Sequence, residues 1–286
     1  MNFEVLDVLD SAAVLYEGFK SDKPLMAGKI GNCELMTLYN YLHAKHLNLN
    51  PIPWDPTIVK ENYINAGVFP QTEESRIYFC EQLLDGLTQG DYIGAWNSGL
   101  AEFEKRVIKK QNINCTLVNL CGLEPYYFGN PWTVHLKGKN VLVISPFAES
   151  IEKQYKIRDK LFNLDILPQF NLKTLYHPNS KAISNKNTYS SWKDMVNDVK
   201  EKMEKIDFDV AIVGTGASSL PIAAHAKRLG KKGIHLGGAV QMLFGIKGKR
   251  WDNMKKANVY YNDFWVRPSH AEVPEKKELV EDGCYW

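Results

Sequence analysis

The sequence predicts an α/β fold with a mostly parallel sheet, and two observations favour this fold class. Strand-like and helix-like segments alternate along the 286 residues, which is typical of parallel strands joined by crossover helices. Several strand-like segments also end in glycine- or serine-bearing turns that lead directly into a helix, as ligand-binding turns of α/β proteins do.

Seven segments read as strands, because each is a short apolar run bounded by turn residues. They are residues 24–30, 91–96, 116–120, 140–145, 172–176, 209–213 and 233–236.

Seven further segments read as helices. They are residues 33–46, 72–87, 100–109, 151–161, 191–205, 219–229 and 239–244. In the 191–205 helix, Trp192, Met195, Val196, Val199 and Met203 recur at helical spacing, so we expect one face to pack on the sheet.

Two connections are longer than a minimal sheet requires. Residues 47–70 and 121–139 are rich in proline and aromatic residues, and we expect ordered loops that hold substrate over the strand ends. Without repeats or a convincing linker, one domain over residues 1–286 with a C-terminal tail at 252–286 is the simplest organisation.

Composition excludes several classes of protein. A net charge of +2 gives no bulk field for nucleic acid or an anionic membrane, and no apolar run approaches a transmembrane helix. Five cysteines without a C-x-x-C pair favour neither a zinc site nor a disulfide framework. We expect a cytoplasmic protein.

Residues 209–238, "DVAIVGTGASSLPIAAHAKRLGKKGIHLGG", contain the clearest local feature. A buried strand runs into a turn with Gly214 and Gly216, and a helix follows whose N-terminus could bind phosphate or carboxylate. Ser219 stands where a dinucleotide fingerprint has its third glycine, and the expected acidic residue about 20 positions later is missing. Anion binding and tight packing both remain open.

Residues 140–154, "NVLVISPFAESIEKQ", repeat the strand–turn–helix arrangement. Ser145 ends the strand, and Ser150 could cap the helix or hold a phosphate. Residues 235–253, "HLGGAVQMLFGIKGKRWDN", add His235, Gly237 and Gly238 at a third strand end.

The basic loop that follows in the same stretch contains Lys249 and Arg250 among glycines. These cations suit a diphosphate, although a solvated loop is the simpler interpretation. Trp251 could stack on a base or sugar, or anchor the loop.

The turn at residues 28–34, "GKIGNCE", places Lys29, Gly31, Asn32 and Glu34 between a strand and a helix. Asn32 and Glu34 offer oxygen ligands for a divalent ion that carries a diphosphate. Alternatively, Glu34 only complements the helix dipole from the first turn.

Together these motifs resemble a known family. The turn "K/R-I-G-x-x-E-L", the run "VLVISPFxxSIxxQ", the stretch "FDVAIVGTGASSLPIAAHAKRLGKKGIHLGGAVQMLFGIKGKRW" and the tail "FWVRPS…GCYW" resemble bacterial and viral proteins with a glycosyltransferase D-type (GT-D) fold-like domain. The resemblance covers about residues 24–286. It implies a Rossmann-like α/β domain, mostly parallel and doubly wound, with helices on both faces.

The resemblance also implies a glycosyltransferase of the hexosyltransferase type, acting in polysaccharide biosynthesis. Its expected donor is a nucleotide sugar, with a UDP-sugar favoured, and its acceptor a glycan or lipid-linked hydroxyl. In the better-known D-type enzymes a D-x-E motif holds the diphosphate with a divalent cation, Mn²⁺ or Mg²⁺. Here the matching positions are Asn32-Cys33-Glu34, so an amide replaces the first acid.

Glu34, Glu149 and Glu124 are the candidate catalytic carboxylates under this interpretation. Two alternatives remain: a catalytically silent nucleotide- or glycan-binding module, and a nicotinamide-dependent oxidoreductase that uses Gly214–Ser219.

Overall fold

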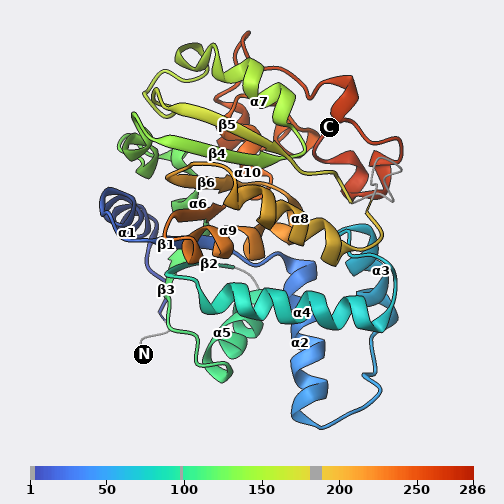
Figure 1. Ribbon diagram of the computed structural model, residues 1–286. Helices are drawn as coiled ribbons and strands as arrows, with labels where there is room; N and C mark the ends of the chain where they lie inside the picture. Colours follow the sequence, from blue (N-terminus) through green and yellow to red (C-terminus); the bar gives the residue numbers. More distant parts are fainter. Residues whose placement is uncertain (1–3, 97–98, 181–188) are drawn as a thin grey trace.

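A computed structural model describes residues 4–96, 99–180 and 189–286. Its centre is a seven-stranded sheet in the order β3-β2-β1-β7-β6-β4-β5, and every neighbouring pair is parallel. The α/β fold class with a parallel sheet is therefore confirmed (Figure 1).

All seven predicted strands are present. Their bounds are β1 Leu25–Lys29, β2 Tyr92–Ala95, β3 Thr116–Asn119, β4 Asn140–Ser145, β5 Asn171–Tyr176, β6 Val210–Val213 and β7 Lys232–His235. The inner strands are short apolar runs, and every residue of β6 is buried. A strand buried on both faces needs such a continuous apolar run rather than alternation.

Helices cover both faces of the sheet, as the alternation of side chains along the strands shows. In β4, Leu142 and Ile144 join one buried cluster, whereas Val141 and Val143 join the other. The first cluster includes apolar residues of α2 Asn32–His46, α4 Glu73–Thr88, α5 Leu100–Lys110, α8 Trp192–Glu204 and α9 Ser219–Arg228. The second includes residues of α1 Val8–Lys20, α6 Leu120–Leu123, α7 Ala148–Tyr155, α10 Ala239–Leu243, α11 Lys249–Asp252 and α12 Lys255–Asn258.

Helical spacing predicted α8 well. Trp192, Met195, Val196, Val199 and Met203 are its buried residues, and Ser191 caps it by accepting a hydrogen bond from the Asp194 amide. The predicted 151–161 helix differs from the structure, because α7 begins at Ala148 and ends at Tyr155, before a 3₁₀ turn at Arg158–Lys160.

The 47–70 connection contains a helix that the sequence interpretation missed. In α3, Pro56–Ile64, the Asp55 carboxylate accepts from the amides of Thr57 and Ile58, and Pro56 occupies the first turn. Both are ordinary helix-start features. The 121–139 connection holds the end of α6 and two 3₁₀ turns, Pro125–Tyr127 and Trp132–Leu136.

The chain leaves β1 and β7 on opposite faces of the sheet, since α2 packs in the first cluster and α10 in the second. In doubly wound folds, ligands bind at such a switch point, outside the carboxyl ends of the strands. None of the helices among the described residues has the length and apolar composition to cross a membrane.

Candidate functional site

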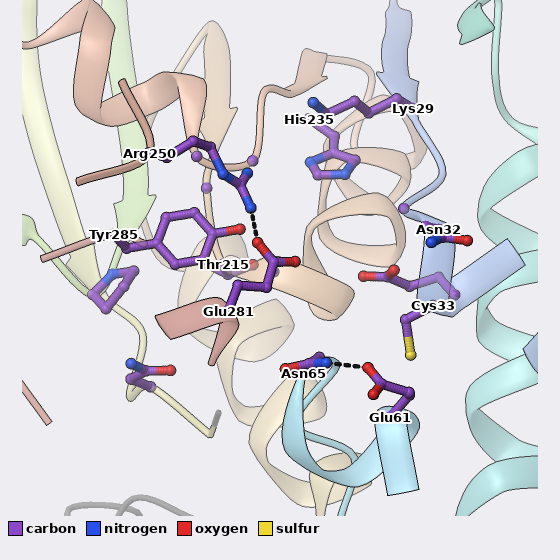
Figure 2. Close-up of a pocket in the computed structure, with 18 of the residues that line it drawn as sticks. Lys29, Asn32, Cys33, Glu61, Asn65, Thr215, His235, Arg250, Glu281 and Tyr285 are labelled. Atoms are coloured by element: carbon purple, nitrogen blue, oxygen red, sulfur yellow. Dashed lines mark hydrogen bonds and ion pairs between the residues drawn. The ribbon is translucent and has the colours of Figure 1, made fainter. Parts of the chain in front are cut away.

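A cavity of about 670 Å³ opens at the carboxyl ends of β1, β4, β6 and β7. Its size lies within the usual range of small-molecule sites, about 300–1,000 Å³. Its walls come from the turns after these strands, from α3 and from residues 281–286 of the tail (Figure 2). The register, with Ala27 beside Ile234 and Val213 beside His235, brings these strand ends to one edge.

Most residues that the sequence indicated as donor-binding line this cavity. They are Lys29, Gly31, Asn32, Glu34, Ser145, Gly214, Gly216, His235, Gly237, Gly238 and Arg250. Strand-end position was therefore a good guide to which residues meet.

Six candidates lie outside the cavity lining: Glu124, Glu149, Ser150, Ser219, Lys249 and Trp251. Glu149 is on the surface of α7 in an ion pair with Lys153, and Glu124 accepts a hydrogen bond from the Tyr126 hydroxyl. The Ser150 amide and hydroxyl bind the Glu272 carboxylate, so this serine fastens the tail to α7.

The other three candidates hold turns in place. Ser219 Oγ accepts a hydrogen bond from the Thr215 amide at 2.8 Å, which occupies one N–H of the glycine turn. Lys249 donates to the Asp282 carbonyl at 2.9 Å, and Trp251 is buried. At Gly214 a Cβ would lie 2.8 Å from the Gly237 carbonyl, so this glycine allows two turns to pack tightly.

Lys29 is the cation at the end of β1, and its side chain is half-buried. Its ammonium forms no hydrogen bond or ion pair with any described residue. Burial lowers the pKa of this ammonium below its ordinary value, against the opposite effect of Glu124. A partly buried cation that contacts no anionic group directly among the described residues favours an anionic ligand.

Arg250 lines the same cavity as Lys29, and in Figure 2 it lies in the upper part of the view, apart from Lys29 and His235. Its guanidinium pairs with the Glu281 carboxylate and lies 4.7 Å from the centroid of the Tyr285 ring. The two paired side chains remain 34% and 52% exposed. Pairs this exposed contribute about 1 kcal/mol or less, so a more highly charged anion can replace the carboxylate.

Glu34 occupies the first turn of α2 and folds back over Gly31. A Cβ added to Gly31 would lie 2.1 Å from Glu34 Oε2, so only glycine allows this placement of the carboxylate. The Gly31 backbone itself is extended, with φ −72° and ψ 162°, and strains no residue type.

A carboxylate side of the cavity comes from α3, which the sequence interpretation missed. Glu61 accepts a hydrogen bond from Asn65, and both face the cavity across from Lys29 and Arg250 (Figure 2). Asn65 Oδ1 is buried and accepts no hydrogen bond from residues 4–96, 99–180 or 189–286. The Asp55–Pro56 start of the helix was the local signal that could have revealed this side.

A buried histidine fixes the glycine turn after β6. His177 Nδ1 lies 2.8 Å from the Pro178 carbonyl, and Nε2 lies 2.9 Å from Ser218 Oγ. Burial lowers the pKa of His177 to about 4, so the ring is neutral at pH 7. The carbonyl can only accept, so Nδ1 carries the hydrogen and Nε2 accepts from Ser218. Ser218 Oγ is 2.9 Å from the hydroxyl of Thr215, which lines the cavity.

Asn32 and Glu34 both line the cavity, as the resemblance to a D-x-E motif requires. No group of three or more histidine, cysteine, aspartate or glutamate side chains among the described residues could hold a metal ion. One amide and one carboxylate therefore do not form a preformed cage. They do fit the way Mg²⁺ is commonly held, by one or two side chains together with substrate phosphates and water.

Comparison with known proteins gives a family and two distant solved structures. The family model of the GT-D fold-like domain matches residues 12–243. No curated protein matches the chain. A selenomethionine-substituted structure of domain of unknown function 1792 is 13% identical, with 82% of this chain and 78% of that chain covered and a TM-score of 0.41.

A second structure of domain of unknown function 1792, described as having a distinct glycosyltransferase fold, is 12% identical. The match covers 94% of this chain and 92% of that chain, with a TM-score of 0.44. The family match extends over most of the sheet and the strand ends that form the cavity. The chain therefore belongs to the GT-D fold-like domain family.

Proposed function

We propose that this protein is a glycosyltransferase that moves a sugar from a nucleotide-sugar donor to a hydroxyl of a glycan or lipid-linked acceptor. The observation that carries the proposal is Lys29, a partly buried ammonium in a cavity at the strand ends that makes no hydrogen bond or ion pair with a described residue, with Arg250 lining the same cavity. Two cations, one of them in an exposed and exchangeable ion pair, suit a diphosphate. Membership of the GT-D fold-like family supports this chemistry over nicotinamide binding.

In the proposed reaction the bond between the anomeric carbon and the diphosphate oxygen breaks, and the acceptor oxygen bonds to that carbon. The electron pair of the broken bond stays on the diphosphate, where Lys29 and Arg250 offset the developing charge. The acceptor hydroxyl loses its proton to a carboxylate if the anomeric centre is inverted. Of the carboxylates that line the cavity, Asp55 caps α3 and Glu281 pairs with Arg250. Glu34 and Glu61 are therefore our candidates for this base.

A divalent cation bound by Asn32 and Glu34 would add positive charge at the diphosphate. Asn32 contributes a neutral oxygen only, so we expect weak binding of the ion in the absence of nucleotide. An Asn32→Asp variant should bind Mn²⁺ more tightly, which isothermal titration calorimetry with Mn²⁺ alone can measure. An unchanged affinity for Mn²⁺ would show that the turn with Asn32 and Glu34 does not bind the metal ion.

The test of the function is a thermal-shift screen with UDP-, GDP-, CMP- and dTDP-sugars, each with and without Mn²⁺, followed by transfer and hydrolysis assays. We expect stabilisation by one nucleotide class, with UDP-sugars favoured, and release of that nucleotide with an acceptor present. Tight binding without turnover would instead support a silent binding module. Absence of binding to every donor would overturn the proposal.

A further inference from the structure

The part of the chain after the family match, residues 244–286, supplies part of the cavity. The match ends at residue 243, yet Arg250, Glu281, Tyr285 and Trp286 all line the pocket. Tail residues are held there by fixed contacts: the Arg250 amide donates to the Cys284 carbonyl at 2.8 Å, and Gln241 Nε2 donates to the Tyr285 carbonyl at 2.8 Å.

Gln241 presents an unpaired acceptor in this region. Its side chain is 1% exposed and lines the cavity. The Tyr285 carbonyl can only accept a hydrogen bond, so the side-chain nitrogen of Gln241 must point to it. The side-chain oxygen Oε1 therefore points away from this carbonyl. Gln241 Oε1 is buried and has no hydrogen-bond partner within the described part of the chain. An unpaired buried acceptor costs about 1–3 kcal/mol, so a ligand donor there is favoured.

Trp286 presents an unpaired donor in the same region. Its indole Nε1 is buried, and none of the residues that the structure describes forms a hydrogen bond with it, although Trp286 lines the cavity. The ring packs edge-on against Tyr285, with centroids 5.8 Å apart and planes at 80°. Since Gln241 bonds to the carbonyl between Tyr285 and Trp286, the orphaned acceptor and the orphaned donor belong to one small region.

The backbone that leads into this region is held in an unfavourable conformation. Glu281 and Asp282 adopt left-handed φ values of 45° and 54°, and Gly283 follows at 75°. The left-handed region costs a non-glycine residue roughly 1–2 kcal/mol. Such strain is typical of segments whose conformation serves a site.

We propose that Gln241 and Trp286 form a ligand subsite for a neutral polar group that offers one hydrogen-bond donor and one acceptor. The donor meets Gln241 Oε1, and the acceptor meets Trp286 Nε1. A nucleobase edge and a pair of sugar hydroxyls share this chemistry. The subsite rests on the proposed function, because both groups are parts of a nucleotide sugar.

The experiment measures dissociation constants of pyrophosphate, UDP and UDP-glucose by isothermal titration calorimetry for the full chain. Trp286→Phe removes the indole N–H and keeps an aromatic ring. We expect it to weaken the binding of UDP-glucose about three- to tenfold, which corresponds to the loss of one neutral hydrogen bond. The affinity for pyrophosphate should not change. Equal weakening of UDP identifies the nucleobase as the source, whereas unchanged UDP identifies the sugar.

Trp54→Phe is the matched control, because Trp54 Nε1 is also buried and unpaired but does not line the cavity. It should bind all three probes as the wild type does. Trp286→Phe that binds UDP and UDP-glucose like the wild type, or that weakens pyrophosphate equally, overturns the subsite alone. A wild-type protein that binds none of the probes overturns the subsite, and the proposed function falls with it only if every donor of the thermal-shift screen also fails to bind.

Discussion

At the scale of single residues, a substitution of Lys29 should weaken ligand binding without lowering the stability of the fold. Lys29→Met keeps the length of the side chain and removes a charge that burial disfavours. We expect an unchanged or larger free energy of unfolding at pH 7, and at least about tenfold weaker pyrophosphate binding, since hydrogen bonds to charged groups contribute roughly 1.5–3 kcal/mol. Calorimetry and denaturant unfolding measure the two quantities.

The lowered pKa of Lys29 also determines how stability changes with pH. The unfolded chain keeps this proton up to about pH 10.5, whereas the folded chain releases it earlier, so wild-type stability rises with pH between the folded pKa and 10.5. Lys29→Met should lose this rise. Lys60→Met, on the exposed side of α3, is the control and should change neither affinity nor slope. Equal pyrophosphate affinities of Lys29→Met and wild type would place the anion elsewhere.

Gly31 and Glu34 should act as one unit. Gly31→Ala places a methyl group where the Glu34 carboxylate lies, at a backbone position that alanine accepts, so it should displace the carboxylate and leave the fold intact. Glu34→Ala should lower donor affinity or turnover at least about tenfold, roughly 1.4 kcal/mol. Gly31→Ala should do nearly the same.

The double variant Gly31→Ala/Glu34→Ala should then be no worse than Glu34→Ala, because both changes remove one interaction. Kinetics of the three variants with the donor found in the screen complete the cycle. Additive losses would show that Gly31 acts separately from Glu34.

At the scale of elements, α3 is the part of the site that local sequence patterns predicted least well. The strands and the glycine turns were predictable, because apolar runs and turn residues are local signals. Prolines at 51, 53 and 56 favoured a loop over residues 47–70, although Pro56 in fact occupies the first turn of α3. Arg250 was indicated by its basic loop, but its ion pair with Glu281 had no local signal, because the two residues lie 31 positions apart.

The same element carries a prediction about chemistry. If Glu61 is the base, Glu61→Gln should lower kcat about 100-fold or more and leave donor affinity within about threefold, since general bases contribute 10²–10⁴. The glutamine keeps an oxygen that can accept from Asn65. Steady-state kinetics of glycosyl transfer, with donor titration as the control, measure the split. A normal kcat would leave Glu34 as the remaining candidate.

At the scale of the whole molecule, two buried groups give stability opposite dependences on pH. Burial raises the pKa of Glu104 from 4.5 to about 7. One of its oxygens, Oε1, is buried and has no partner among the described residues, which suits a neutral acid. Burial lowers the pKa of His177 from 6.5 to about 4. Between pH 4.5 and 6.5, Glu104 is protonated in the folded chain and ionised in the unfolded chain. Over the same range, His177 is neutral in the folded chain and protonated in the unfolded chain.

Stability from Glu104 is therefore lost as pH rises toward 7, and stability from His177 is lost as pH falls toward 4. Each effect amounts to at most about 3 kcal/mol, and the two offset each other in the wild type. Glu104→Gln, which keeps the acceptor for the Trp96 amide, should make unfolding easier at pH 4.5 than at pH 6.5 relative to wild type. His177→Gln should have the opposite slope, with easier unfolding at pH 6.5 than at pH 4.5. The double variant should return to the weak pH dependence of the wild type. Urea unfolding at several pH values measures the slopes, and parallel curves for all four proteins would mean that neither group changes its protonation on folding.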